Sequence, residues 1–182
     1  MTTTTPSLII SKLDAARRQL ETAITLWFDD GDPVSIHTLA SAAYEIIHAV
    51  SKQRNPFRRD LLFDSDQIKD EHRAEFNLLI KQYANFFKHA KNDGNATIEF
   101  RPVLSEMFLV FSLLGIGQCG EQFNATESAF ALWLRLHKPH FLTKDGNVKF
   151  IDRFGVEYIA EMKAVPKKEF LKAVRIGLAA RE

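Results

Sequence analysis

Polar and titratable residues recur every three or four positions beside the apolar stripe of the longest predicted helix. Positions with this spacing share one face of a helix, so the side chains form a row along the flank of the stripe. An imidazole in such a row can titrate near neutral pH and act as a base or a ligand. We therefore take His89 and Asn85, with the neighbouring Lys88, as candidate catalytic residues. Glu75 and Gln82 of the same row are candidate substrate contacts.

The helix predicted just before it carries a second polar row. His37, Tyr44 and His48 line the flank of its apolar face at helical spacing. If the two helices pack as neighbours, the rows face each other across one polar groove, and these three residues also become candidate substrate contacts. Arg58 and Arg59, in the connector, would supply cations to the same groove. The alternative interpretation is that apolar stems pack at the edge of the core while the polar tips stay in water.

The residues from Ala84 to His89 resemble the signature of the HEPN superfamily, whose members are small helical bundles. That signature has Arg, a polar residue that is often Asn, three variable residues and then His, late in a long helix. Asn85 and His89 match it, and Ala84 stands at the Arg position. The resemblance implies a homodimer in which Arg and His of two subunits converge on the scissile phosphate of an RNA. The stretches DGDPVSIHTLA and NFFKHA together also resemble a group of uncharacterised bacterial all-helical proteins.

Two functional hypotheses follow from this resemblance when Ala84 replaces the Arg. A noncatalytic module that binds nucleotide, RNA or a protein partner is favoured, because the cation that holds the phosphate is missing. The alternative is a metal-independent ribonuclease of toxin or defence type, in which Lys88 or one of the connector arginines supplies that cation. We expect a homodimer in both cases. The 15 Phe residues offer an apolar face that would suit a protein partner.

Two further motifs raise the question of cofactor or metal chemistry. Gly115, Gly117 and Gly120 spell G-x-G-x-x-G, which in dinucleotide-binding folds lets the backbone approach a pyrophosphate. The apolar run before them is too long for one strand, so we expect a break between helices and no cofactor. Glu45 and His48 form one E-x-x-H pair, whereas di-iron bundles use two such pairs and two further Glu. A His/Glu metal-binding bundle completed by the longest helix is therefore a third hypothesis.

Composition narrows the class of protein. Hydrophobic residues make up 46% of the chain and charged residues 26%, which is typical of soluble globular proteins. The formal net charge of +1 predicts no strongly basic surface for nucleic acid. Cys119 is the single cysteine, so neither an internal disulfide nor a thiolate cluster can form. The most apolar run, residues 103–114, is shorter than the roughly 20 residues that span a membrane, and the N-terminus lacks a signal-peptide pattern. We expect a cytoplasmic protein with no membrane partner.

Hydrophobic periodicity predicts an all-α protein, a single-domain helical bundle of about six helices. Residues 1–7 are Thr-rich and are predicted to form a flexible N-terminal arm, and residues 8–182 the single helical domain. An Asp-Gly-Asn turn between short apolar flanks predicts a small hairpin at residues 141–151. Helix starts are predicted at Ser11, at Asp32 and at Asn124. The longest helix is predicted to run from about residue 64 to residue 92.

Overall fold

The computed structural model describes residues 7–90, 93–141 and 143–179. Every regular element within these ranges is helical, which confirms the predicted all-α class. The described residues form eight α-helices rather than about six, and one of them occupies the expected hairpin. The helices are α1 (Lys12–Phe28), α2 (Pro33–Arg54), α3 (Arg73–Lys88), α4 (Leu104–Gln118), α5 (Ala125–His137), α6 (Lys144–Phe154), α7 (Val156–Ala164) and α8 (Lys167–Ala179), with 3₁₀ turns η1 (Leu62–Asp64), η2 (Asp70–His72) and η3 (Pro139–Phe141).

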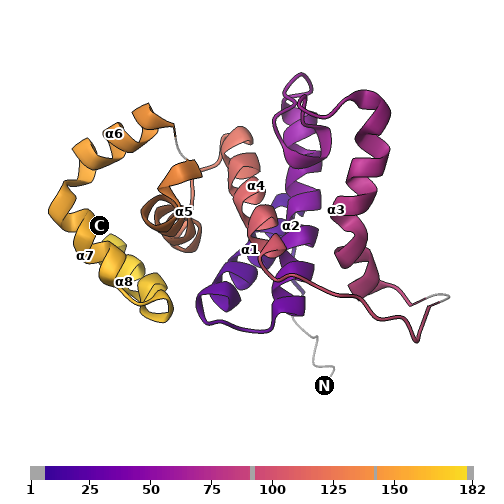
Figure 1. The fold of residues 1–182 in the computed structure, drawn as a ribbon, viewed down its shortest axis with the longest axis horizontal. Helices are drawn as coiled ribbons and strands as arrows, with labels where there is room; N and C mark the ends of the chain where they lie inside the picture. The colour runs from indigo at the N-terminus through magenta and orange to yellow at the C-terminus, as the bar shows by residue number, and fades with distance from the viewer. Residues whose placement is uncertain (1–6, 91–92, 142, 180–182) are drawn as a thin grey trace.

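The helices form two neighbouring groups (Figure 1). In the first, α2 packs against α1, α4 and α3, and α3 stands at the outer edge of the molecule. In the second, α5 packs against α8 and α7, while α6 and α7 occupy the opposite edge. Contacts of α1 with α5 and α8 join the two groups. The two helices that carry the polar rows, α2 and α3, are therefore neighbours, which is the condition under which the rows could face each other.

Aromatic side chains make the junction between the groups. The rings of Phe28 on α1 and Phe170 on α8 are stacked, with their centroids 5.9 Å apart. Trp27 meets Phe130 and Trp133 of α5 edge to face, at 5.1 and 6.0 Å. Phe28, Phe130 and Phe170 are fully buried, so one continuous apolar core extends from α1 into α5 and α8.

Local capping explains where the helices begin, and the three starts predicted from the sequence are confirmed. The Ser11 side chain accepts a hydrogen bond from the Asp14 N–H ahead of α1. Asp32 accepts one from the Ser35 N–H at 2.7 Å, with Pro at the first position of α2. Asn124 forms a complete capping box at α5: its side chain accepts from the Glu127 N–H, and the buried Glu127 carboxylate accepts from the Asn124 N–H.

The prediction of one helix from residue 64 to residue 92 is wrong, because α3 begins later and ends earlier than expected. Residues 62–64 and 70–72 form the 3₁₀ turns η1 and η2, with residues 65–69 between them outside any helix, and α3 begins only at Arg73. Long-range hydrogen bonds fix this connector, because the Phe63 N–H donates to the buried Tyr44 hydroxyl and the Phe63 carbonyl accepts from Asn77. At the other end, His89 has extended backbone angles (φ −131°, ψ 136°) and closes α3. Residues 91 and 92 lie outside the described ranges.

The expected hairpin at residues 141–151 is also wrong, because most of this segment belongs to α6. Thr143 caps that helix by accepting a hydrogen bond from the Gly146 N–H at 3.1 Å. The Asp-Gly-Asn triplet therefore lies in the first helical turn instead of a strand-to-strand turn. Phe150 and Phe154 then fall four residues apart on one face, with ring centroids at 5.0 Å. Of the predicted N-terminal arm, residues 1–6 lie outside the described ranges.

The G-x-G-x-x-G motif serves helix packing and helix termination. Gly115 lies inside α4, where an added Cβ would stand 2.5 Å from Ile47 Cγ2 of α2. The missing side chain therefore lets the two helices approach closely. Gly120 has a φ of +76° and follows the end of α4, as expected for the glycine that stops a helix.

Candidate functional site

The candidate catalytic residues lie at the solvent-facing end of α3. Asn85, Lys88 and His89 are exposed, and the contact between Asn85 and His89 is the backbone hydrogen bond that ends the helix, at 3.0 Å. Within the described ranges, no side-chain hydrogen bond or ion pair joins these three groups. Glu75, near the start of α3, stands 3.9 Å from His72 on the helix surface. The row shares a face, but it does not converge on a polar cavity.

The position that carries Arg in the HEPN signature faces the core of this protein. Ala84 is 1% exposed and is the buried residue of α3. A side chain at this position points toward the interior, whereas Asn85 and His89 are open to solvent. A longer cationic side chain at residue 84 would therefore have to displace core contacts before it reached the surface of Asn85 and His89.

His37 belongs to a buried aromatic chamber. Its side chain is 0% exposed, and its Nδ1 lies 3.1 Å from the Ser105 hydroxyl. Burial, with a smaller contribution from the positive charge of Lys88, lowers the pKa of His37 to about 4. The imidazole is therefore neutral at physiological pH and is a weak base. A cavity of about 200 Å³ adjoins it, lined almost entirely by apolar side chains and by Gln82.

Four aromatic rings surround this imidazole at centroid distances of 5.0 to 6.0 Å. Each ring meets it edge to face, which is the geometry in which a ring N–H or C–H contacts a π face. Its Nε2 has no hydrogen-bond partner in the described structure. The rings belong to Tyr83, Phe87, Phe100 and Phe108.

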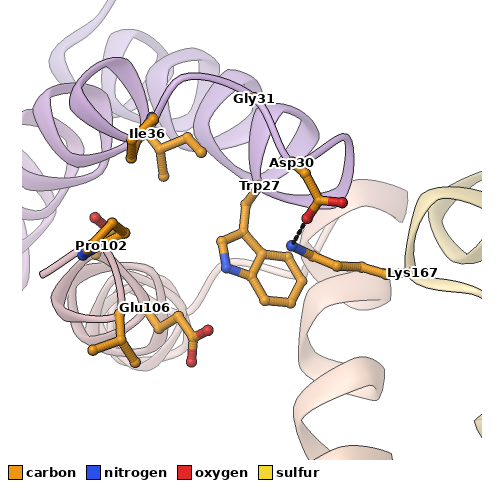
Figure 2. Close-up of a pocket in the computed structure, with 10 residues that line it drawn as sticks. Trp27, Asp30, Gly31, Ile36, Pro102, Glu106 and Lys167 are labelled. Carbon is orange, nitrogen blue, oxygen red and sulfur yellow. Dashed lines mark hydrogen bonds and ion pairs between the residues drawn. The ribbon is translucent and has the colours of Figure 1, made fainter.

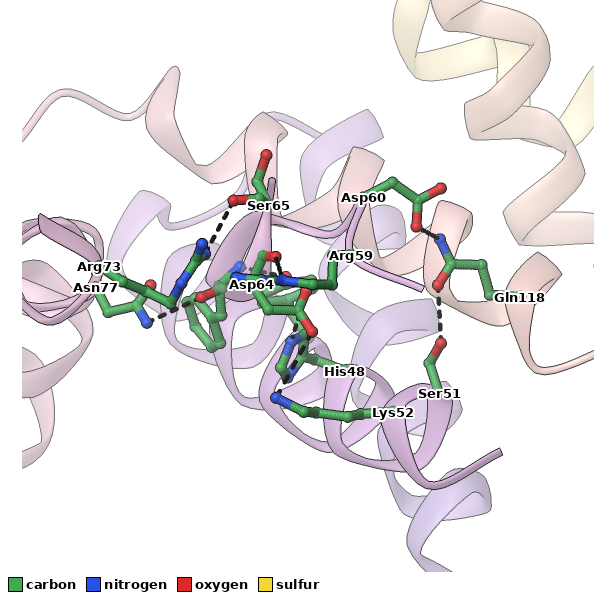
Figure 3. A network of polar contacts seen from close by, with 12 residues as sticks. His48, Ser51, Lys52, Arg59, Asp60, Asp64, Ser65, Arg73, Asn77 and Gln118 are labelled. Atoms are coloured by element: carbon green, nitrogen blue, oxygen red, sulfur yellow. Dashed lines mark hydrogen bonds and ion pairs between the residues drawn. The ribbon is translucent and has the colours of Figure 1, made fainter. Parts of the chain in front are cut away.

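His48 lies in a different environment, beside the buried carboxylate of Asp64 (Figure 3). The His48 Nε2 and the Asp64 Oδ1 are 3.2 Å apart, although their orientation does not meet the angles of a hydrogen bond. Lys52 Nζ stands 3.8 Å from the second carboxylate oxygen, and the Arg59 guanidinium reaches the Asp64 carbonyl at 3.4 Å. This cluster ties α2 to the connector. It explains why Asp64 leaves the predicted helix.

The two connector arginines are bound to nearby carboxylates. Arg59 donates to Asp70, and this contact lowers the pKa of the Asp70 carboxyl. Arg58 Nε lies 3.1 Å from an Asp60 carboxylate oxygen. Tyr44, another candidate contact, is 0% exposed and serves as the acceptor for the connector backbone. The candidate substrate contacts therefore do not form one groove, because these residues contact different parts of the fold.

A cleft of about 390 Å³ opens where the α1–α2 turn meets the first residues of α4 and α8 (Figure 2). The Lys167 ammonium lies 4.0 Å from the centre of the Trp27 ring and 2.6 Å from the Asp30 carboxylate. That ion pair lowers the pKa of Asp30. Glu106 on the far wall pairs with Lys138. The charged groups of this cleft are thus already paired with one another. The Lys167–Asp30 ion pair connects α8 to the α1–α2 turn.

A second cavity, lined by two arginines without a carboxylate partner among the described residues, lies in a groove bounded by α5, α6, α7 and α8. We call it the C-terminal groove. Its volume is about 530 Å³, and Phe150, Phe154 and Tyr158 form an aromatic ladder along it. Arg135 and Arg153 are exposed at its wall. Sequence reasoning missed this groove, although aromatic residues recur at four-residue spacing at 150, 154 and 158, across the junction of α6 and α7 at Gly155.

The described residues do not assemble the ligands that the third hypothesis, a His/Glu metal centre, requires. Across residues 7–90, 93–141 and 143–179, no three His, Cys, Asp or Glu side chains are grouped so that they could hold a metal ion. Glu45, half of the E-x-x-H pair, lies 3.9 Å from Lys81 on α3, and His48 faces Asp64. The sole cysteine, Cys119, is buried, and burial raises the pKa of its thiol.

Among the described helices, none combines the length and the apolar character needed to cross a lipid bilayer. Comparison with known proteins identifies no relative: no family model, no curated protein and no solved structure matches this chain. The class that the fold defines is therefore an all-α helical protein. Its function must be inferred from its own cavities and charges.

Proposed function

We propose that this protein is a noncatalytic binding module whose ligand occupies the C-terminal groove. The observation that carries this proposal is a cavity of about 530 Å³ with aromatic walls and two exposed guanidinium groups. Ligand sites are typically clefts of about 300–1,000 Å³, mostly apolar, with a few polar groups that orient the ligand. The C-terminal groove has both properties.

The surroundings of the histidines support binding rather than catalysis. A general base needs a suitable pKa and a position within hydrogen-bond reach of the proton it removes. His37 is buried among aromatic rings with a pKa of about 4, and His48 faces a structural carboxylate. His89 is exposed at the end of α3, where no nucleophile or cation meets it among the described side chains. None of the three adjoins the C-terminal groove.

Gly177 allows the groove to be blocked without disturbing the fold. It lines the groove from α8, and a Cβ added there meets no atom within 4 Å. Because Gly177 lines the groove, we expect a Gly177→Leu side chain to obstruct the cavity. Gly117 is the matched control, because it is also helical and open on all sides but lies on α4, outside the groove.

The test measures binding of the neutral, apolar dye Nile red by fluorescence titration. We expect the wild type and Gly117→Leu to bind equally, and Gly177→Leu to bind at least about tenfold more weakly, a loss of roughly 1.4 kcal/mol. Circular dichroism verifies that all three are folded. Equal dye affinity in the wild type and Gly177→Leu would contradict the proposed site.

A second candidate function rests on the outer face of α3. Leu78 and Leu79 are 67% and 56% exposed on the helix that also carries Asn85 and His89. These leucines support self-association through α3, which would bring His89 of two copies toward one RNA-binding surface, as the HEPN resemblance implies. Here the expected results are a wild-type dimer and a Leu78→Lys monomer in sedimentation equilibrium. RNA binding should be lost in His89→Ala. A wild-type chain that stays monomeric at all concentrations would remove this candidate.

A further inference from the structure

We infer that the ligand of the C-terminal groove is an amphipathic carboxylate, with its apolar tail in the groove and its carboxylate held by Arg135 and Arg153. This inference rests on the proposed function and specifies the chemistry of its ligand. Three features of the groove support it: the two arginines, the aromatic ladder, and a described lining without acidic residues.

The two guanidinium groups lie over neighbouring aromatic rings. The Cζ atom of Arg135 is 5.8 Å from the centre of the Phe150 ring, and that of Arg153 is 5.4 Å from the centre of the Phe154 ring. These ring centres are themselves only 5.0 Å apart. Each cation therefore stands over one of two neighbouring rings, where a π face supports the guanidinium plane and leaves N–H donors for an anion.

Neither guanidinium is paired with a carboxylate among the described residues. Within residues 7–90, 93–141 and 143–179, no carboxylate lies within ion-pairing distance of Arg135 or Arg153. A planar guanidinium matches a carboxylate with paired N–H donors, so these two groups favour a ligand with such a head. Elsewhere in the fold a carboxylate partner is present for Arg17, Arg18, Arg54, Arg58, Arg59, Arg73 and Arg175.

The rest of the groove selects for an apolar tail. Leu132 of α5, Met162 of α7, and Val174 and Leu178 of α8 contribute aliphatic surface to its walls. Among the described residues that line the groove, the polar ones besides the arginines are Ser128 and Tyr158, and none is Asp, Glu, Asn or Gln. A nucleotide or a sugar needs several donors and acceptors to recognise its edges, and an amine needs a carboxylate. A ligand with one anionic head and a hydrocarbon tail matches this set of groups.

Head-group selectivity provides the direct test. Decanoate, decanol and decylammonium share a tail and differ in charge, so their affinities can be compared by displacement of Nile red below their aggregation concentrations. We expect decanoate to bind about tenfold more tightly than decanol, and decylammonium more weakly than both. Octanoate should bind more weakly than decanoate by up to about fourfold per methylene removed, since each buried methylene contributes about 0.8 kcal/mol.

Charge variants show whether the two arginines set this preference. In the Arg135→Gln/Arg153→Gln double variant, decanoate should lose its advantage over decanol while decanol binding is kept. Lys172→Gln is the matched control, since it removes one exposed positive charge from α8 outside the groove lining. It should retain the wild-type preference. A preference that persists in the double variant would overturn the inference.

The outcomes separate this inference from the proposed function. Equal binding of decanoate and decanol, with Nile red still blocked by Gly177→Leu, would overturn the carboxylate ligand and leave the groove as a binding site. Failure of Nile red and of all three decyl compounds would overturn both. Tighter binding of adenosine monophosphate than of decanoate, lost in the Gly177→Leu variant, would replace the amphipathic ligand by a nucleotide.

Discussion

Arg17 on α1 holds the carboxylate of Glu127 at the start of α5 with two hydrogen bonds. The Nε–Oε1 and Nη2–Oε2 distances are 3.0 and 2.7 Å. Glu127 is 0% exposed and also closes the capping box of α5 by accepting from the Asn124 N–H at 2.8 Å. The hydrogen bonds from Arg17 compensate for the burial of the Glu127 charge and raise the pKa of the arginine. One residue pair thus orients the helix that forms a wall of the C-terminal groove.

Replacement of Arg17 by Met should destabilise the protein by about 3–5 kcal/mol. The substitution leaves a buried carboxylate without its cation, and removing one partner of a buried pair has this order of cost. Urea denaturation followed by circular dichroism measures the change. Arg18→Met is the control, because Arg18 forms an exposed pair with Asp14 and should cost less than about 1 kcal/mol. Equal effects of the two substitutions would contradict the structural role of the Arg17–Glu127 pair.

Gly115→Ala and Gly117→Ala should change stability in opposite directions. At residue 115 the new methyl group would stand 2.5 Å from Ile47 Cγ2, so α2 and α4 must separate, which costs about 1–3 kcal/mol. At residue 117 the methyl group meets no atom within 4 Å, and replacing a helical glycine by alanine stabilises by about 0.5–1 kcal/mol. Thermal unfolding of the two variants measures both changes.

A double variant identifies the cause of the Gly115→Ala effect. Ile47→Ala alone removes a buried side chain, but it also makes room for a methyl group at residue 115. We expect the combined Ile47→Ala/Gly115→Ala destabilisation to be smaller than the two single effects added together, by more than about 0.5 kcal/mol. Strict additivity would mean that the two side chains do not meet.

His37 should make the protein less stable as the pH falls from about 6.5 to about 4. Its pKa is about 4 in the folded state and 6.5 in the unfolded chain, so the unfolded chain takes up the proton first. The stability present above pH 6.5 is then lost through this window, by about 3 kcal/mol, with no further loss below pH 4. Denaturation of wild type and His37→Gln across this range measures the difference. Parallel pH profiles for the two proteins would contradict a buried neutral imidazole.

Tyr44→Phe should destabilise the protein by about 1–3 kcal/mol. The substitution keeps the buried ring but leaves the Phe63 N–H without its acceptor, at present 3.1 Å away. Burial also raises the pKa of the Tyr44 hydroxyl, which stays protonated at physiological pH. Tyr83→Phe is the control, because no hydrogen bond of the Tyr83 hydroxyl occurs among the described residues. The readout is the urea midpoint, and similar midpoints for both variants would contradict the prediction.

Local chemistry explains which parts of the fold could be predicted from the sequence. The starts of α1, α2 and α5 were predictable because a cap such as Asp32 acts within three residues of itself. The connector before α3 was not, since its shape depends on Tyr44, Asn77 and other groups distant in the sequence. The hairpin was predicted from the Asp-Gly pair at residues 145 and 146. Thr143, three residues before Gly146, is instead the N-cap of a helix.

The candidate site was predictable in its spacing and not in its environment. Helical periodicity placed His37 and His48 on one flank of α2, but their partners are Ser105, 68 positions away, and Asp64. Burial of an imidazole depends on such long-range packing, which a single sequence does not encode at any fixed spacing. The C-terminal groove is harder still to predict from the sequence. Its walls come from four helices, so it can be recognised only when the relative positions of these helices are known.

Methyl chemical-shift mapping with decanoate tests the central claim most directly, because it locates the ligand in the folded protein. The account predicts saturable shifts at the methyl groups of Met162 and Val174 in the C-terminal groove. The methyl groups of Leu78 and Leu79, exposed on α3, should not move. Shifts centred on α3, or none in the groove at saturating decanoate, would contradict it.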